Sequence, residues 1–187
     1  MHPLIEAAGR RGEFPGWAEL NDHRRAHVER VAALLALWAE TLGLPEDEQV
    51  RWRAAGRLHD ALKDAATPVL RELVEDDSWP EPLLHGPAVS TRLAREGVDD
   101  DEFLLAVAFH SVGHPSFRAL GEHVYLADYL DPGRPETGDR QALRDAMPAG
   151  LDDVLRRVIR QRIEYQLGER RPILSASIDF WNRVVVS

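Results

Sequence analysis

The 187-residue sequence contains no cysteine. Disulfide bonds and thiolate zinc sites are therefore excluded, so that any metal ion must be bound by histidine, aspartate or glutamate. The absence of cysteine also fits the reducing cytoplasm, where structural disulfides are rare. Because about 150 residues is a typical domain length, we expect residues 1–187 to form a single domain with a core large enough to need no cross-link.

Long apolar segments are also missing. The longest apolar run, residues 31–39, is far shorter than the about 20 residues that a membrane-spanning helix needs. The first residues lack the basic and apolar regions of a signal peptide. We therefore expect a cytoplasmic protein without a membrane partner, and nothing in the sequence excludes a homodimer.

Positive charge is in short supply. Acidic residues outnumber basic ones by 32 to 23, which gives a formal net charge of −9. This balance argues against a nucleic-acid partner, because nucleic-acid binding is driven by cationic surface. An acidic protein that acts on a phosphate compound needs local positive charge, and bound metal ions would supply it.

Strand-like alternation of polar and apolar residues is absent, whereas a helical period of 3.6 residues runs through most of the chain. Proline and glycine predict loops at about 76–82 and 131–138. The pattern predicts an all-α protein with helices at about 21–41, 45–62, 69–74, 84–96, 100–110, 117–130, 151–167 and 175–185.

Histidine and aspartate side chains occur where the helical pattern faces the interior. A lone His-Asp pair is usually a surface or capping feature, and a lone buried histidine is usually hydrogen-bonded in the core. A buried carboxylate, however, is costly unless it is paired or bound to a metal. Six inward residues together favour a metal-dependent hydrolase, with the metal bound by His27, His59, Asp60, His85, His110 and Asp128.

The order of these six residues resembles the HD-domain superfamily. Three strings are similar to one branch of it, the YqeK family of bacterial diadenosine tetraphosphate hydrolases, which cut symmetrically to two ADP. The strings are His59-Asp60-Ala61-Leu62-Lys63-Asp64, His85-Gly86-Pro87-Ala88 and Leu126-Ala127-Asp128-Tyr129-Leu130-Asp131-Pro132-Gly133-Arg134. The third is the most specific, and the resemblance covers about residues 20–165.

The resemblance implies an HD-domain helical bundle with two metal ions in its core. His27, His59, Asp60 and Asp128 would hold one ion, and Asp60 would bridge to a second ion held by His85 and His110. Iron is the expected metal, while manganese, cobalt and nickel also suit such ligands. The implied catalytic residues are Asp60, Lys63 and Asp64, and the implied substrate contacts are Lys63, His114, Asp131 and Arg134.

Departures from the family pattern leave the substrate open. The family has two threonines, a glycine and a basic residue after the histidine at 110, whereas this chain has Ser111-Val112-Gly113-His114. His114 is a weaker cation than arginine, because the charge of histidine depends on pH. Metal-activated hydrolysis of diadenosine tetraphosphate is favoured. The alternatives are another HD-domain nucleotide phosphohydrolase, such as a nucleoside monophosphate phosphatase, and a non-catalytic metal-binding signalling module.

Two further features have simpler interpretations. The arginines of the last third of the chain are expected to form a solvated helix face that guides an anionic substrate at most; they are Arg156, Arg157, Arg160, Arg162, Arg170 and Arg171. No partner is predicted for His123.

Overall fold

The computed structural model describes residues 1–135 and 138–186, and within these ranges all regular secondary structure is helical. The predicted all-α class is confirmed. None of these helices is long and apolar enough to cross a membrane. The α-helices are α1 (Pro3–Glu6), α2 (Asp22–Thr41), α3 (Glu46–Leu58), α4 (Thr67–Leu73), α5 (His85–Arg95), α6 (Asp101–Phe109), α7 (Ala119–Tyr129), α8 (Arg140–Ala146), α9 (Leu151–Gly168) and α10 (Ser175–Val186).

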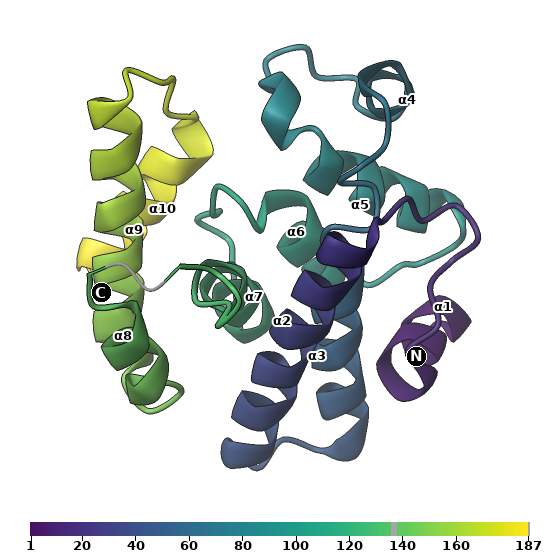
Figure 1. Cartoon of the computed structure of the whole chain (residues 1–187), viewed down its shortest axis with the longest axis horizontal. Coiled ribbons are helices and arrows are strands. Elements are labelled where there is room, and N and C mark those ends of the chain that lie inside the picture. The colour runs from purple at the N-terminus through teal and green to yellow at the C-terminus, as the bar shows by residue number, and fades with distance from the viewer. Residues whose placement is uncertain (136–137, 187) are drawn as a thin grey trace.

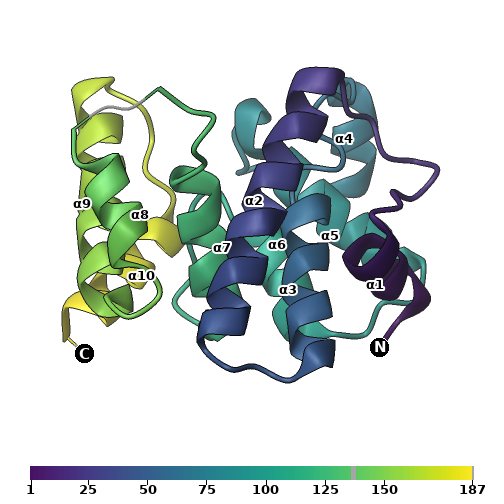
Figure 2. The ribbon, with the colours of Figure 1, turned by 60° about the horizontal axis from the view of Figure 1, so that its bottom comes forward.

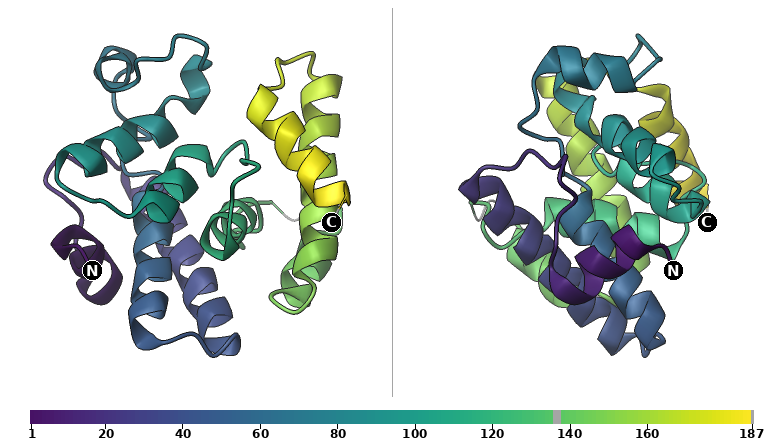
Figure 3. Two further views of the ribbon diagram at one scale, coloured as in Figure 1. Left: turned by 180° about the vertical axis from the view of Figure 1, so that it is seen from behind. Right: turned by 90° about the vertical axis from the view of Figure 1, so that its right-hand side faces the viewer.

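The helices form a central bundle with a C-terminal group at one side. The long helices α2 and α3 lie side by side, joined by a short turn, and α7 lies between this pair and the C-terminal helices α8–α10 (Figure 1, Figure 2). Seen from behind, α10 packs against α9 at the edge of the molecule (Figure 3). Helix α7 thus packs against both the central bundle and the C-terminal group of helices.

Local signals in the sequence define α2, which carries the first predicted ligand. The side chain of Asn21 accepts a hydrogen bond from the backbone N–H of Arg24, as expected of an N-cap residue. At the other end Gly43 adopts a positive φ of 66°, which a glycine just past a helix end allows without strain.

Two glycines set the helix contacts that bring the predicted ligands together. A Cβ atom at Gly56 would lie 2.6 Å from the Cα of Ala32, so that α3 approaches α2 this closely only without a side chain. A Cβ atom at Gly86 would lie 2.6 Å from the carbonyl oxygen of Ala108, which fixes α5 against α6 in the same way. Across these two pairs of helices, the ring of His27 lies 5.4 Å from that of His59 and the ring of His85 lies 5.0 Å from that of His110, measured between centroids.

The structure differs from the predicted elements at short segments. The helix α1, the π-helical turn Ala7–Arg11 and helix α8 were not predicted, because a helix of one or two turns shows too few apolar repeats to be recognised. Helix α3 ends at Leu58, and a turn replaces the predicted helical continuation to about 62. The predicted loop at 131–138 includes residues 136–137, which lie outside the described residues, and the other residues of this loop are not helical.

His123 is a buried core residue. Its ring lies 4.5 Å from the ring of Trp52 and 5.9 Å from that of Trp38, measured between centroids. Its Nδ1 donates a hydrogen bond to the carbonyl oxygen of Ala119 at 2.7 Å. Burial outweighs this hydrogen bond and lowers the pKa of His123 to about 4.

We expect His123 to make the protein sensitive to mild acid. The unfolded chain, in which this imidazole has its ordinary pKa of 6.5, takes up the proton before the folded protein does. The free energy of unfolding therefore falls as the pH drops from about 6.5 to about 4, by up to ~3 kcal/mol from this residue. Urea unfolding at several pH values should show a shallower fall for His123→Leu than for the wild type, and a wild-type fall for His23→Leu, which changes an exposed histidine. Equal slopes for all three proteins would contradict the expectation.

Candidate metal centre

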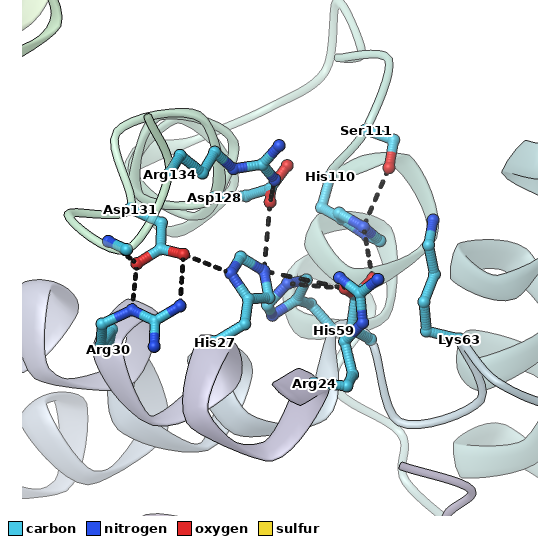
Figure 4. Close-up of polar contacts among 12 residues, drawn as sticks. Arg24, His27, Arg30, His59, Lys63, His110, Ser111, Asp128, Asp131 and Arg134 are labelled. Atoms are coloured by element: carbon cyan, nitrogen blue, oxygen red, sulfur yellow. Dashed lines mark hydrogen bonds and ion pairs between the residues drawn. The ribbon is translucent and has the colours of Figure 1, made fainter. Parts of the chain in front are cut away.

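The six residues predicted to bind metal converge in the interior of the bundle. His27 lies within α2, and His59 and Asp60 directly follow α3. His85 begins α5, His110 directly follows α6, and Asp128 lies near the end of α7. All six are buried, which is unusual for charged side chains without a compensating partner. Figure 4 shows His27, His59, His110 and Asp128 directed toward one another from these elements.

The carboxylate of Asp60 lies between two pairs of histidines. Its Oδ1 is 3.1 Å from Nε2 of His85 and 3.3 Å from Nε2 of His110. Its Oδ2 is 3.7 Å from Nε2 of both His27 and His59. The ligand atoms in each of the two groups lie within 4.8 Å of one another, so each group could hold an ion and Asp60 belongs to both. Asp128 adds a second carboxylate, whose Oδ1 is 3.3 Å from Nε2 of His27.

Hydrogen bonds behind the rings set the orientation of three histidines. Nδ1 of His59 lies 2.8 Å from the carbonyl oxygen of Gly56, and Nδ1 of His110 lies 2.7 Å from that of Val107. Since a carbonyl only accepts, Nδ1 carries the proton and Nε2 offers its lone pair to the centre of the site. Nδ1 of His27 has the carboxylate of Asp131 as its acceptor at 2.7 Å.

Unsatisfied atoms in the site match the needs of a cation. Nε2 of His27 and of His59 is buried, and neither atom has a hydrogen-bond partner among the described residues. A metal ion would satisfy these nitrogens and the carboxylates beside them at once, and histidine with aspartate is a donor set that divalent transition metals accept. The residues present therefore fit a metal site.

Electrostatics prepare the same residues for a cation. Burial lowers the pKa of His59 to about 3 and that of His85 to about 4, so both rings are neutral at pH 7. Burial alone would raise the pKa of Asp60, but the surrounding histidines hold it well below its usual range. For His27, the carboxylates of Asp128 and Asp131 outweigh the effect of burial and raise the pKa to about 9. A metal ion that binds there must displace this proton.

Lys63 and Arg134, which the resemblance assigned to the substrate, both border the site. The Nζ of Lys63 is 3.2 Å from each ring nitrogen of His85, and burial lowers the pKa of this lysine. Nη2 of Arg134 donates to Oδ1 of Asp128 at 2.5 Å. Both side chains line a cavity of about 790 Å³ that opens onto Asp60 and Asp128. Its volume is in the range of pockets for small molecules.

Three residues that the resemblance assigned to catalysis or to the substrate, Asp64, His114 and Asp131, do not line this cavity. Asp131 is only 1% exposed, and its carboxylate is held by His27, by two nitrogens of Arg30 and by the backbone N–H of Gly133. It lies behind His27 and is not free to contact a substrate (Figure 4).

Asp64 and His114 are also engaged elsewhere. The exposed carboxylate of Asp64 accepts a hydrogen bond from the backbone N–H of Asn21, at the start of α2. The ring of His114 lies 4.5 Å from that of Phe109, and its Nδ1 accepts from the backbone N–H of Ser116.

Two arginines at the site were not predicted. Nη1 of Arg24 donates to Oδ2 of Asp60 at 2.9 Å. Its position three residues before His27, on the same helix face, is a signal that could have identified it. Arg162 was expected on a solvated face, but its side chain is only 22% exposed, and its Nη2 lies 3.2 Å from Oδ2 of Asp128. No sequence pattern connects these two residues, which are 34 positions apart.

Three bacterial enzymes are similar to this protein over most of the chain. A bis(5'-nucleosyl)-tetraphosphatase (symmetrical) of Bacillus subtilis is 24% identical over 175 residues, which cover 89% of this chain and 92% of that protein. An enzyme of the same name from Halalkalibacterium halodurans is 25% identical, over 89% of this chain and 91% of that protein. Another from Staphylococcus aureus is 24% identical, over 88% of each chain.

A crystal structure has the same fold. It is of a protein from Clostridium acetobutylicum described as a predicted HD superfamily hydrolase involved in NAD metabolism, and it superposes with a TM-score of 0.77. The two proteins are 25% identical, over 89% of this chain and 91% of the other. The model of the HD domain family matches residues 24–133, which is more than half of the sequence and includes all six predicted metal ligands. The chain therefore belongs to the HD domain family.

Proposed function

We propose that this protein is a metal-dependent hydrolase that cleaves diadenosine tetraphosphate symmetrically into two ADP. The observation that carries the proposal is the position of Asp60 between two histidine pairs, in the lining of a cavity that Arg24, Lys63 and Arg134 also line. The similarity to three bacterial enzymes named for this reaction supports the choice of substrate.

Two metal ions would be held by the converging residues. His27, His59, Asp60 and Asp128 would bind one ion, and Asp60, His85 and His110 the other. Iron is our proposal, and manganese, cobalt and nickel suit the same donors. When bound, such ions polarise phosphate oxygens and lower the pKa of water.

The chain itself would bind and orient the polyphosphate. Arg24, Lys63 and Arg134 would hold phosphate oxygens, and the planar guanidinium of Arg134 suits paired hydrogen bonds to one phosphate. Water would attack one of the two inner phosphorus atoms. The bond from that phosphorus to the oxygen shared with the other inner phosphate would break, and the oxygen would leave with the second ADP. Asp64 and His114 have no role in this proposal because they do not line the cavity.

The whole chain would act as a single domain. The cavity is lined by α7 of the matched HD segment and by α9 beyond it, so we propose that the C-terminal helices belong to the same unit. A nucleotide substrate of this kind would be met in the cytoplasm.

A product assay tests the proposed function. Protein prepared without chelator and supplied with metal is incubated with diadenosine tetraphosphate in ¹⁸O-labelled water. ADP should be the only nucleotide product, and one of the two ADP molecules should carry one ¹⁸O atom. AMP with ATP would contradict symmetrical cleavage. Absence of turnover, together with rapid hydrolysis of a nucleoside monophosphate, would favour the alternative phosphatase.

Asp131 is expected to control metal affinity through His27. In Asp131→Asn a neutral amide replaces the carboxylate opposite Nδ1 of His27, so that the ring loses the negative charge that raises its basicity. Metal affinity should fall about 10–100-fold, as measured by competition with a chelator. Asp100→Asn is a matched control, because Asp100 forms a similar two-bond pair with Arg51 away from the histidines. Equal metal affinity in both variants would contradict this role.

A further inference from the structure

Helix α9, which lies outside the matched HD segment, forms one wall of the cavity. The lining residues include Ile159, Arg162, Ile163 and Gln166. Their spacing places them on one face of the helix over about two turns, a length of about 10 Å. The cavity therefore extends from the candidate metal centre along this helix.

Two polar atoms on this face are unsatisfied. Nε of Arg162 and Oε1 of Gln166 are buried, and neither has a hydrogen-bond partner among the residues that the structure describes. Buried polar atoms without partners are few in folded proteins and call for an explanation. The two residues are one helical turn apart and line the same cavity, so a single bound molecule could satisfy both.

Arg162 is held firmly beside the candidate metal centre. Its Nη1 donates to the carbonyl oxygen of Ser111 at 2.5 Å, and its Nη2 lies 3.2 Å from Asp128. Its guanidinium carbon also lies 4.5 Å from the ring centroid of Tyr125 and 5.1 Å from that of Tyr129. A guanidinium fixed in this way needs little further ordering to bind an anion.

Gln166 lies one helical turn beyond Arg162 on this face, and the apolar side chains of Ile163 and Ile173 also line the cavity. A side-chain amide both donates and accepts, as the edge of a nucleobase does, and glutamine pairs well with adenine. Apolar side chains suit the faces of a base. The order along α9 is thus a cation first and an amide one turn later, in a cavity that isoleucines also line.

We propose that α9 forms a subsite for one nucleoside diphosphate half of the substrate, in which Arg162 binds phosphate and Gln166 binds the base. The inference rests on the proposed nucleotide substrate and adds to it the residues that select a nucleotide over a simple phosphate. Arg160 provides a contrast two positions away, because it is 63% exposed and pairs with Glu164.

Calorimetric titration of the metal-loaded protein with ADP and with inorganic diphosphate tests the subsite. Gln166→Leu should weaken ADP binding about 3–10-fold and leave diphosphate binding unchanged, because only ADP has a base. Arg162→Ala should weaken the binding of both about 10–100-fold without loss of metal. Arg160→Ala should bind both as the wild type does.

Several results would overturn the inference. If Gln166→Leu binds ADP as strongly as the wild type does, Gln166 does not contact the base. The same conclusion would follow if this variant lost diphosphate binding to the same extent as ADP binding. Loss of metal from Arg162→Ala would show that Arg162 acts through Asp128 instead of binding phosphate. If the wild type binds ADP in the expected pattern but does not cleave diadenosine tetraphosphate, the proposed reaction fails and the subsite stands. If the wild type cleaves diadenosine tetraphosphate but both variants bind ADP as the wild type does, the proposed reaction stands and the subsite fails.

Discussion

Asp60→Ala should lower kcat for diadenosine tetraphosphate by more than about 1,000-fold. The variant removes a carboxylate that faces both histidine pairs, so that neither proposed ion keeps its shared ligand. Loss of several kcal/mol of stabilisation by metal ions corresponds to this factor at ~1.4 kcal/mol for each tenfold change. Elemental analysis should find less metal in the variant, and its circular dichroism should remain helical.

Two further variants make the result for Asp60 interpretable. Asp60→Asn keeps the volume of the side chain and should also lose activity, which guards against a packing defect in the alanine variant. Asp153→Ala removes an exposed carboxylate on α9 that pairs with Arg156, and it should behave as the wild type. Wild-type turnover by either Asp60 variant would contradict a bridging role for Asp60.

Arg134→Ala should lower kcat/KM for diadenosine tetraphosphate by ~10–1,000-fold, the loss expected for ~1.5–4 kcal/mol of charge-assisted contact. The guanidinium of Arg134 lines the cavity beside Asp128, and a tetraphosphate offers it more oxygens than a monophosphate does. Steady-state kinetics with the dinucleotide measure the effect, and the metal content of the variant should equal that of the wild type.

Two variants serve as comparisons for Arg134→Ala: a lysine substitution at the same position and an alanine substitution at a different arginine. Arg134→Lys keeps the charge but not the planar fork, and should recover part of the activity. Arg160→Ala removes an exposed arginine and should leave kcat/KM unchanged. A normal kcat/KM for Arg134→Ala would exclude a phosphate contact. A loss of metal would instead indicate that Arg134 acts by orienting Asp128.

The distribution of charge around the cavity reconciles an acidic protein with an anionic substrate. The formal net charge is −9, yet five basic side chains of the described residues line the cavity, namely Arg24, Lys63, Arg134, Arg140 and Arg162. Three of them contact the carboxylates of Asp60 or Asp128. A polyphosphate would thus meet locally positive charge although the protein as a whole would repel it.

The amino-acid sequence by itself determined the fold class and the set of candidate ligands. The period of apolar residues is a local property, so the long helices and their caps could be predicted without knowledge of their packing. The four histidines and two aspartates were recognisable as candidate ligands because each interrupts an apolar helix face. The short helix α8 and the end of α3 were not predicted, because one or two turns contain too few repeats.

Only the tertiary structure decided which side chains border the cavity and which support them. Asp131 lies within the specific motif and was expected at the substrate, but the turn after α7 directs its carboxylate to His27 and Arg30. Arg162 and Gln166 reach the cavity because α9 packs beside α7, a contact between segments far apart in the sequence. Such contacts follow from how whole helices pack, and a periodic pattern specifies only which face of a helix is buried, not what that face will meet.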